Sequence, residues 1–116
     1  MSRFFFVLLL SLAAFGCSSE GTVSTAKAIP SAAYETLSYI LEHNEPPKGY
    51  VGGRRFGNYE KRLPLKAMDG GRISYREWDI YPKKAGQNRG PERIVTSSDH
   101  RAWYTPDHYD SFILMK

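Results

Sequence analysis

Cysteine is nearly absent from this chain of 116 residues, since Cys17 is the only one. No intramolecular disulfide can form, so a hydrophobic core alone must hold the fold together. Acidic side chains are also the minority, with 12 Asp and Glu against 16 Lys and Arg, which gives a net charge of +4. This charge favours anionic partners such as nucleic acid or a membrane surface but does not choose between them. The length suits one compact domain, and the sequence contains no internal repeat.

Long apolar runs are limited to one segment at the N-terminus. Residues 1–16 read MSRFFFVLLLSLAAFG, in which the positive Arg3 precedes apolar and small residues. The run is too short to span a bilayer as a stable helix and ends in small residues, so we expect an export signal peptide. The alternative, a buried core helix, is disfavoured because the run is at the extreme N-terminus and has no polar face.

Cys17 directly follows this segment, at the first position of the expected mature chain. That is the position of the acylated cysteine in bacterial lipoproteins, so we expect lipidation of Cys17 and a membrane anchor. Ala14 and Phe15 depart from the lipoprotein pattern, and the alternative is an exported protein with one free thiol. Either alternative predicts export, with the protein secreted or lipid-anchored in the bacterial envelope.

The remaining chain divides into a tether and a domain. Residues 17–30 are mostly small and polar, which is typical of a flexible tether. Pro30 and Ser31 then predict the start of a helix, with Ser31 as its N-cap. Apolar residues recur at helical spacing on one face, at Ala33, Leu37, Ile40 and Leu41. We expect the helix to run from about Ser31 to His43, before the sequence NEPP ends it.

After residue 50 the helical period gives way to short runs rich in aromatic and β-branched residues. Turn signals separate these runs, which read YVGGRRF, RISYREWDIY, ERIVTSS, AWYT and DSFILM. The pattern predicts an antiparallel meander. One amphipathic helix followed by several strands implies an α+β domain over residues 31–116. We expect the helix to pack on one face of a single antiparallel sheet and to leave the other face open for a ligand.

Two carboxylates are expected on the open face. Side chains alternate along a strand, so Tyr75, Glu77 and Asp79 point to one side. Trp78 and Ile80 point to the other side and are natural core residues.

Two arginines are expected close to these carboxylates. Ile94 is a core residue of the next strand, so Arg93 faces the same side as the acids, with Arg89 in the connecting loop. Two acids and two guanidinium groups suit a phosphate beside a proton that must be moved. The alternative is a ladder of cross-strand ion pairs on a solvated face.

The chain has three histidines. His43 is at the predicted helix end and His100 is in a turn, so both have structural or surface explanations. His108 is in TPDHYD, a turn that leads into the last strand. A lone histidine in a loop is usually only solvated, so its position alone assigns no function.

Several segments together resemble a known family. The segments YREWDIY, NRGPERIVTSSD and YTPDHYDSF resemble the C-terminal half of the barnase-like guanyl-specific microbial ribonucleases. The preceding RRFGNYEKRLP is similar to the guanine-recognition loop of that family. The resemblance covers Val51 to the C-terminus and the helix before it. It implies the microbial ribonuclease fold and an endoribonuclease that acts on RNA without a metal or another cofactor.

The resemblance implies roles for residues on the expected open face and in the last turn. Glu77 corresponds to the general base of the family and His108 to its general acid. Arg89 and Arg93 correspond to its phosphate-binding arginines. Further substrate-contacting or arginine-holding positions correspond to Tyr109 and Asp79.

The resemblance also implies that the loop RRFGNYEKRLP recognises guanine. Phe56, Asn58 and Glu60 match features of the family. Glu60 would accept hydrogen bonds from the guanine N1–H and amino group, and backbone N–H groups around Asn58 would donate to O6. Adenine has the opposite donor and acceptor pattern, so the site should reject it. Tyr59 departs from the arginine of several relatives, and it either stacks on a base or packs the loop.

The implied reaction uses the 2′-OH of RNA as the nucleophile. Glu77 takes its proton, His108 protonates the departing 5′ oxygen, and the arginines stabilise the charged transition state. A 2′,3′-cyclic phosphate forms and is then hydrolysed to a 3′-guanylate end. The main alternative is a non-catalytic lipoprotein of the same fold that binds RNA or another polyanion. A structural envelope protein is the third alternative.

The implied partners follow from this reaction. RNA is the substrate, and an exported ribonuclease endangers its producer, so a protein inhibitor similar to barstar is a further implied partner. We expect the protein itself to be a monomer.

Overall fold

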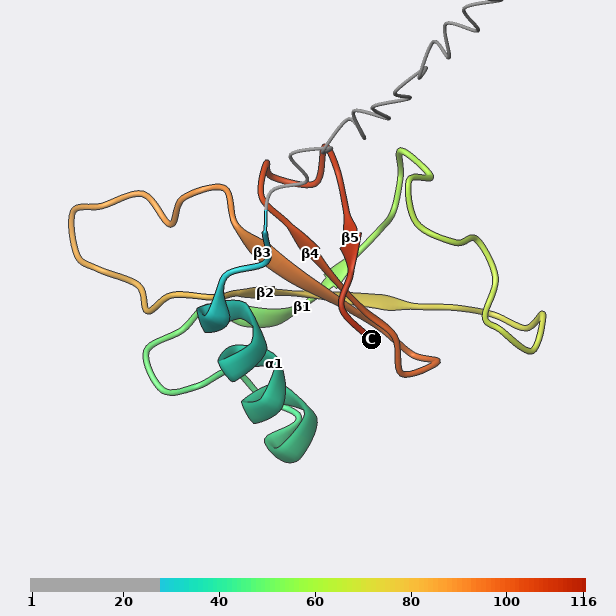
Figure 1. The fold of residues 1–116 in the computed structure, drawn as a ribbon, viewed down its shortest axis with the longest axis horizontal. Coiled ribbons are helices and arrows are strands. Elements are labelled where there is room, and N and C mark those ends of the chain that lie inside the picture. Colours follow the sequence, from blue (N-terminus) through green and yellow to red (C-terminus); the bar gives the residue numbers. More distant parts are fainter. Residues whose placement is uncertain (1–27) are drawn as a thin grey trace, which may run out of the picture.

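The computed structural model describes residues 28–116, so the expected signal peptide, most of the expected tether and Cys17 lie outside it. The elements in chain order are α1 (Ser31–His43), β1 (Gly52–Phe56), β2 (Tyr75–Asp79), β3 (Arg93–Ser97), β4 (Ala102–Thr105) and β5 (Ile113–Leu114). All neighbouring strands pair antiparallel in the order β1-β2-β3-β4-β5. Figure 1 shows α1 on one side of this sheet. The predicted α+β meander is confirmed.

Helix α1 has the predicted bounds but a different N-terminal cap. Pro30, with an extended backbone, is the cap residue, and no side chain caps the helix. The prediction that Ser31 is the N-cap is therefore wrong, because Ser31 already has helical geometry. The helix ends at Asn44 in the left-handed conformation, a conformation that asparagine tolerates, and the Asn44 N–H donates to the Ile40 carbonyl at 2.7 Å. Within residues 28–116 no helix has the length and apolar character needed to cross a membrane.

The buried stripe of α1 differs from the predicted one at two positions. Its buried residues are Ala33, Thr36, Leu37 and Ile40. Leu41, predicted on this face, is 49% exposed. Leu41 is four residues after Leu37, but it lies about 100° around the helix from Ile40, at the edge of the buried stripe. Thr36 is tolerated in the core because its hydroxyl donates to the Ile80 carbonyl at 3.4 Å.

The first hydrophobic core lies between α1 and the sheet. The sheet contributes Trp78, Ile94, Ala102 and Tyr104, and Ile80 directly follows β2; all five are buried. Ile29, in the segment expected to be a tether, also packs against this core. The packed part of the chain therefore includes the last residues of that segment.

The opposite face of the sheet was expected to be open, and this prediction is wrong for much of its area. Leu63, Tyr75, Val95 and Trp103 form a second buried core there. Residues from the loops 57–74 and 106–112 cover this core. Figure 1 shows them as two separate segments, one coloured green to yellow and the other red. Tyr75, predicted to be open, is only 3% exposed. The surface available to a ligand is therefore restricted to the part of this sheet face that the second core does not occupy.

Candidate active site

A β-bulge in β1 sets which of its side chains face Glu77. Gly52 pairs with Trp78, but the next pair joins Arg54, not Gly53, to Glu77. Gly53 has a φ of +87°, a left-handed conformation that glycine adopts without strain. Because the extra residue shifts the alternation by one, Arg54 lies on the same face as Glu77. Sequence reasoning did not identify Arg54, because strict alternation from Gly52 would put it on the helix side.

Glu77 and Asp79 lie on one face of β2, as the alternation predicts. Glu77 is opposite Val95 and Asp79 is opposite Arg93 in the β2–β3 pairing. Glu77 is partly exposed, whereas Asp79 is only 4% exposed. The prediction that both carboxylates lie on an open surface is therefore correct for Glu77 but wrong for Asp79, which the surrounding side chains cover.

Asp79 lies between the two predicted arginines. Its Oδ1 is 3.0 Å from Arg93 Nε and 3.7 Å from Arg89 Nη1. Burial raises the pKa of Asp79, while the charges of Arg93 and Arg89 oppose this shift. The Arg93 N–H is not aimed at the carboxylate, so this close contact is an ion pair without an aligned hydrogen bond. Arg93 is fixed instead by Nη1, which donates to the carbonyls of Gly90 and Glu92, both at 2.8 Å.

The loop between β4 and β5 presents His108 and Tyr109. Both residues have positive φ angles, 52° and 72°, which are unusual for non-glycine residues. Asp107 holds the loop in this conformation, because it accepts hydrogen bonds from the Thr105 hydroxyl and from the backbone and hydroxyl of Ser111. The pKa of Asp107 is raised by burial but lowered more strongly by these hydrogen bonds, so its net shift is downward.

Tyr109 connects the two predicted acid–base residues. Its hydroxyl donates to Glu77 Oε2 at 2.6 Å, and the ring centroids of His108 and Tyr109 are 4.8 Å apart. Burial first, and then the hydrogen bond to Glu77, raises the pKa of Tyr109 well above its ordinary value. Tyr109 therefore remains a donor to Glu77 at neutral pH. The imidazole of His108 is exposed to solvent.

A cavity of about 260 Å³ adjoins His108 and Tyr109. Its lining residues come from the loop after β1 and from the loop after β4, and are Phe56, Asn58, Tyr59, Glu60, Arg62, His108, Tyr109 and Phe112. All four predicted recognition residues thus line one pocket together with His108. Sequence reasoning missed Arg62 and Phe112, because their place depends on how the two loops meet.

Asn58 shapes the loop that forms one wall of this pocket. Its side-chain amide donates to the Leu63 carbonyl at 3.0 Å and accepts from the Leu63 N–H at 3.1 Å. Asn58 has a φ of 49°, in the left-handed region that asparagine tolerates. Because the side chain is fully used inside the loop, the groups of Asn58 left for a ligand are those of its backbone.

Glu60 and Tyr59 are at the mouth of the pocket. Arg62 Nε donates to Glu60 Oε2 at 2.8 Å, and Arg62 Nη2 is 3.3 Å from Asp110 Oδ1 in the His108 loop. The Tyr59 ring is 92% exposed and lies against Gly57, where a Cβ atom would overlap it. Apart from this contact with Gly57, Tyr59 is exposed, so its ring is accessible to a flat ligand.

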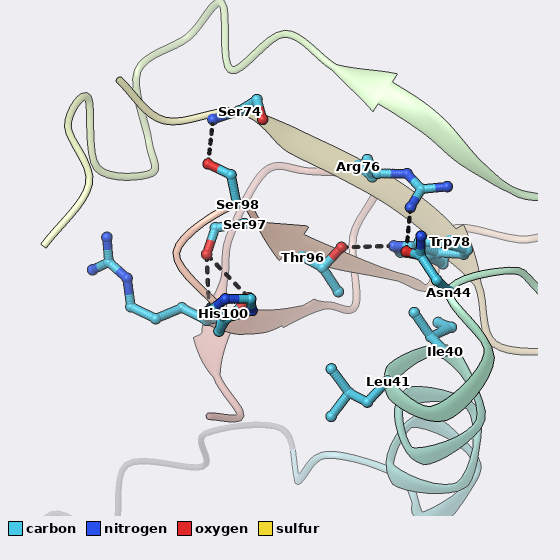
Figure 2. A pocket seen from close by; sticks show the side chains of 11 residues that line it. Ile40, Leu41, Asn44, Ser74, Arg76, Trp78, Thr96, Ser97, Ser98 and His100 are labelled. Carbon is cyan, nitrogen blue, oxygen red and sulfur yellow. Dashed lines mark hydrogen bonds between the residues drawn. The ribbon is translucent and has the colours of Figure 1, made fainter. Parts of the chain in front are cut away.

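A larger cavity, about 450 Å³, is on the helix side of the sheet (Figure 2). Arg76 Nη1 donates there to Asn44 Oδ1 at 2.8 Å, and Trp78 Nε1 donates to Thr96 Oγ1 at 2.9 Å. None of the predicted site residues lines it. Its polar groups largely bond one another, so the smaller cavity lined by His108 and Tyr109 is the better candidate despite its size.

Glu77, Asp79, Arg89 and Arg93 do not line this cavity, and Glu77 is connected to it through Tyr109. The groups of the cavity and of this adjoining cluster together suit chemistry on a phosphate ester. A carboxylate and an imidazole can move protons, and the guanidinium groups can stabilise negative charge on oxygen. In the part of the chain that the structure describes, no cluster of three His, Cys, Asp or Glu residues could hold a metal ion.

Comparison with known proteins gives two kinds of match. A family model described as ribonuclease matches residues 13–116. Among solved structures, the chain is similar to crystal structures of ribonuclease Sa2 with guanosine-2′-cyclophosphate and with exo-2′,3′-cyclophosphorotioate. Both are 32% identical with a TM-score of 0.55, and the match covers 76% of this chain and 87% and 88% of theirs. No match was found among curated proteins.

Proposed function

The chain belongs to the ribonuclease family and is an RNA-cleaving enzyme, and we propose that it is an endoribonuclease that cuts single-stranded RNA on the 3′ side of guanosine. In this proposal Glu77 is the general base and His108 the general acid. The reaction passes through a 2′,3′-cyclic phosphate and uses the 2′-OH of the substrate as its nucleophile.

The observation that carries the proposal is the arrangement of Glu77 and His108 around Tyr109. The carboxylate accepts a hydrogen bond from the Tyr109 hydroxyl, and the imidazole lies beside the Tyr109 ring. A nucleotide seated over this tyrosine would have its 2′-OH next to one group and its leaving oxygen next to the other. General acid–base catalysis needs this geometry, with one group on each side of the reacting phosphorus.

Arg89 and Arg93 supply positive charge to the same phosphate in this proposal. Their ion pairs with the buried Asp79 hold them beside Glu77, so little reorganisation is needed when charge develops. Because Arg93 is 3% exposed, a substrate would reach only the edge of its guanidinium, whereas Arg89 is more accessible.

Guanine recognition is the finer part of the proposal. Glu60 would accept hydrogen bonds from the guanine N1–H and amino group, while Phe56 and Tyr59 would contact the flat faces of the base. A carboxylate at the pocket mouth supports guanine over adenine, because adenine has no N1–H to donate. The similar protein ribonuclease Sa2 has been crystallised with a guanosine cyclophosphate, which agrees with this assignment.

Digestion of a defined RNA in the presence of EDTA, with the product ends mapped, tests the proposal. We expect cuts after guanosine and transient 2′,3′-cyclic phosphate ends. Glu77→Gln and His108→Ala should each lower turnover by about 100-fold or more. Glu60→Gln should weaken the preference for guanosine while leaving cleavage chemistry intact. Binding without cleavage would contradict the proposal and favour the non-catalytic alternative.

The N-terminal segment supports a second, independent proposal about location. We propose that residues 1–16 direct export and that Cys17 is then lipidated, since the apolar run and the cysteine have the order of a lipoprotein signal. Mass spectrometry of the N-terminal peptide from the membrane fraction would detect the acyl chains. Recovery of an unmodified Cys17 thiol from secreted protein would contradict lipidation but not export.

A further inference from the structure

We propose that Arg54 supplies a third guanidinium group to the active site, in addition to Arg89 and Arg93. From its position across the strand pair from Glu77, it would bind the scissile phosphate on the side that faces solvent. The inference rests on the proposed function, because it assigns Arg54 to the same phosphodiester on which Glu77 and His108 act. Neither the sequence resemblance nor strict strand alternation identifies this residue.

The bulge at Gly53 is the first support. It shifts the β1 register so that Arg54 pairs with Glu77, whereas the next residue, Arg55, pairs with Arg76 on the helix face. Residues directly opposite each other in an antiparallel pair have Cβ atoms about 5 Å apart. The Arg54 guanidinium is therefore within reach of anything that Glu77 contacts. Bulges often redirect a side chain beside an active site.

The distribution of charge is the second support. Arg89 and Arg93 both face Asp79, which neutralises part of their charge. Arg54 forms no ion pair in the part of the chain that the structure describes, although its charge also lowers the pKa of Asp79, after the larger effects of Arg93 and Arg89. Arg54 is thus the cation of this cluster that no carboxylate engages directly, and it is exposed to solvent.

The chemistry needs such a group. Attack of the 2′-OH on phosphorus adds negative charge to the non-bridging oxygens, and a donor on the open side of the sheet can follow that charge. In this proposal the buried Arg93 would contact the phosphate from the sheet side. Its guanidinium group is already held by hydrogen bonds from Nη1 to two backbone carbonyls. Arg54 approaches from the neighbouring strand and supplies a planar fork of N–H donors that suits phosphate oxygens.

The experiment compares Arg54→Gln with the matched control Arg55→Gln, whose side chain is on the opposite face. The substrate is a dinucleoside monophosphate with guanosine on the 5′ side, which contains only the scissile phosphate. We expect Arg54→Gln to lower kcat/KM by about 10- to 100-fold, mainly through kcat, because the contact strengthens in the transition state. Arg55→Gln should remain close to the unmodified enzyme. Arg54→Lys should recover part of the loss, because it keeps the charge but not the fork.

Thermal unfolding of both variants checks that they remain folded at the assay temperature. If Arg54→Gln does not fold, Arg54→Met, which keeps the aliphatic stem, replaces it. On longer RNA, loss of one phosphate contact should reduce the salt dependence of substrate binding by about one unit of log–log slope.

Three outcomes would overturn the proposal. The Arg54 and Arg55 variants could behave alike, the defect could appear only in KM, or it could appear on long RNA but vanish on the dinucleotide. The last outcome would mean that Arg54 contacts a neighbouring phosphate. The variant Glu77→Gln, assayed in parallel, distinguishes a failure of the Arg54 proposal from a failure of the proposed function. If Glu77→Gln cleaves normally, the acid–base assignment is wrong whatever Arg54 does.

Discussion

Two tyrosine hydroxyl groups on one face of the sheet have different partners, one in the proposed active site and one in a loop backbone. Tyr75 belongs to the second core, and the partly buried Tyr109 packs against that core on the same face of the sheet. The Tyr109 hydroxyl donates to Glu77 at 2.6 Å, whereas the Tyr75 hydroxyl donates to the Pro64 carbonyl at 2.7 Å. The two residues therefore make similar hydrogen bonds, one to the proposed base and one to a loop backbone.

Phenylalanine substitutions should separate these two roles. Tyr109→Phe removes a donor from Glu77 and should lower kcat by about 10- to 100-fold, since one positioned hydrogen bond to a charged group contributes about 1.5–3 kcal/mol. Tyr75→Phe should cost about 1 kcal/mol of stability and leave kcat unchanged. Steady-state kinetics on a dinucleotide and thermal unfolding of both variants provide the measurement. Equal kcat values for the two variants would show that the Tyr109 hydroxyl is only structural.

The sequence predicts side-chain positions well where strand alternation is regular. Glu77 and Arg93 face the same side, as the pattern of core residues around them requires. Arg54 is missed because one glycine with a positive φ reverses the alternation, and the pattern GGRRF does not say which glycine bulges. Arg62 is missed for another reason: its contact with Asp110 joins two loops that only the tertiary fold brings together.

At the level of elements, the helix and strands follow from the sequence more directly than the loops do. The apolar period and the flanking start and stop signals predict α1 at about its observed bounds, and the five strands lie within the predicted runs. The cover over the catalytic face is not predicted, because it depends on long-range hydrogen bonds that no local pattern reveals. One example is the bond from the Met68 N–H in the loop 57–74 to Asp99 Oδ2, in the β3–β4 turn, at 3.0 Å.

Asp99 anchors this loop, and its titration should therefore affect stability. The hydrogen bond from Arg101, and then bonds from Ser97 and the Met68 backbone, hold the pKa of Asp99 well below its ordinary value of 3.8. A carboxylate with a lowered folded-state pKa stabilises the fold above its unfolded-state pKa. That contribution is lost as the pH falls from about 4 toward the folded-state value.

We therefore expect the melting temperature to fall on acidification below about pH 4, and Asp99→Asn to show a shallower fall. Asn cannot accept the same charge-assisted bond from Arg101, so the variant should also melt lower at neutral pH. Asp110→Asn, an exposed aspartate in the His108 loop, is the control. Scanning calorimetry over the acid range provides the measurement. A slope in Asp99→Asn as steep as in the unmodified protein would assign the acid sensitivity to other carboxylates.

On the scale of the whole molecule, one sheet separates two hydrophobic cores, and only one of them includes residues that line the proposed base pocket. The core under α1 contains Leu37, and its cluster includes none of the residues that line the proposed base pocket. The core on the catalytic face contains Leu63, packed with Phe56 and Tyr109, which both line that pocket. Leu37 is 5% exposed and Leu63 is 3% exposed, so the two leucines are equally buried.

Alanine substitutions at these two leucines should therefore have similar thermodynamic effects and different functional ones. Each removes a buried side chain and should cost about 2–5 kcal/mol of stability. At a temperature where both variants are folded, Leu37→Ala should keep its KM for a guanosine dinucleotide, because the sheet isolates the helix-side cavity from the pocket. Leu63→Ala should raise KM, since the recognition loop, which Asn58 ties to the backbone of Leu63, loses support beneath it. Denaturant unfolding and steady-state kinetics measure the two effects, and an equal KM in both variants would mean that the two faces of the sheet are mechanically coupled.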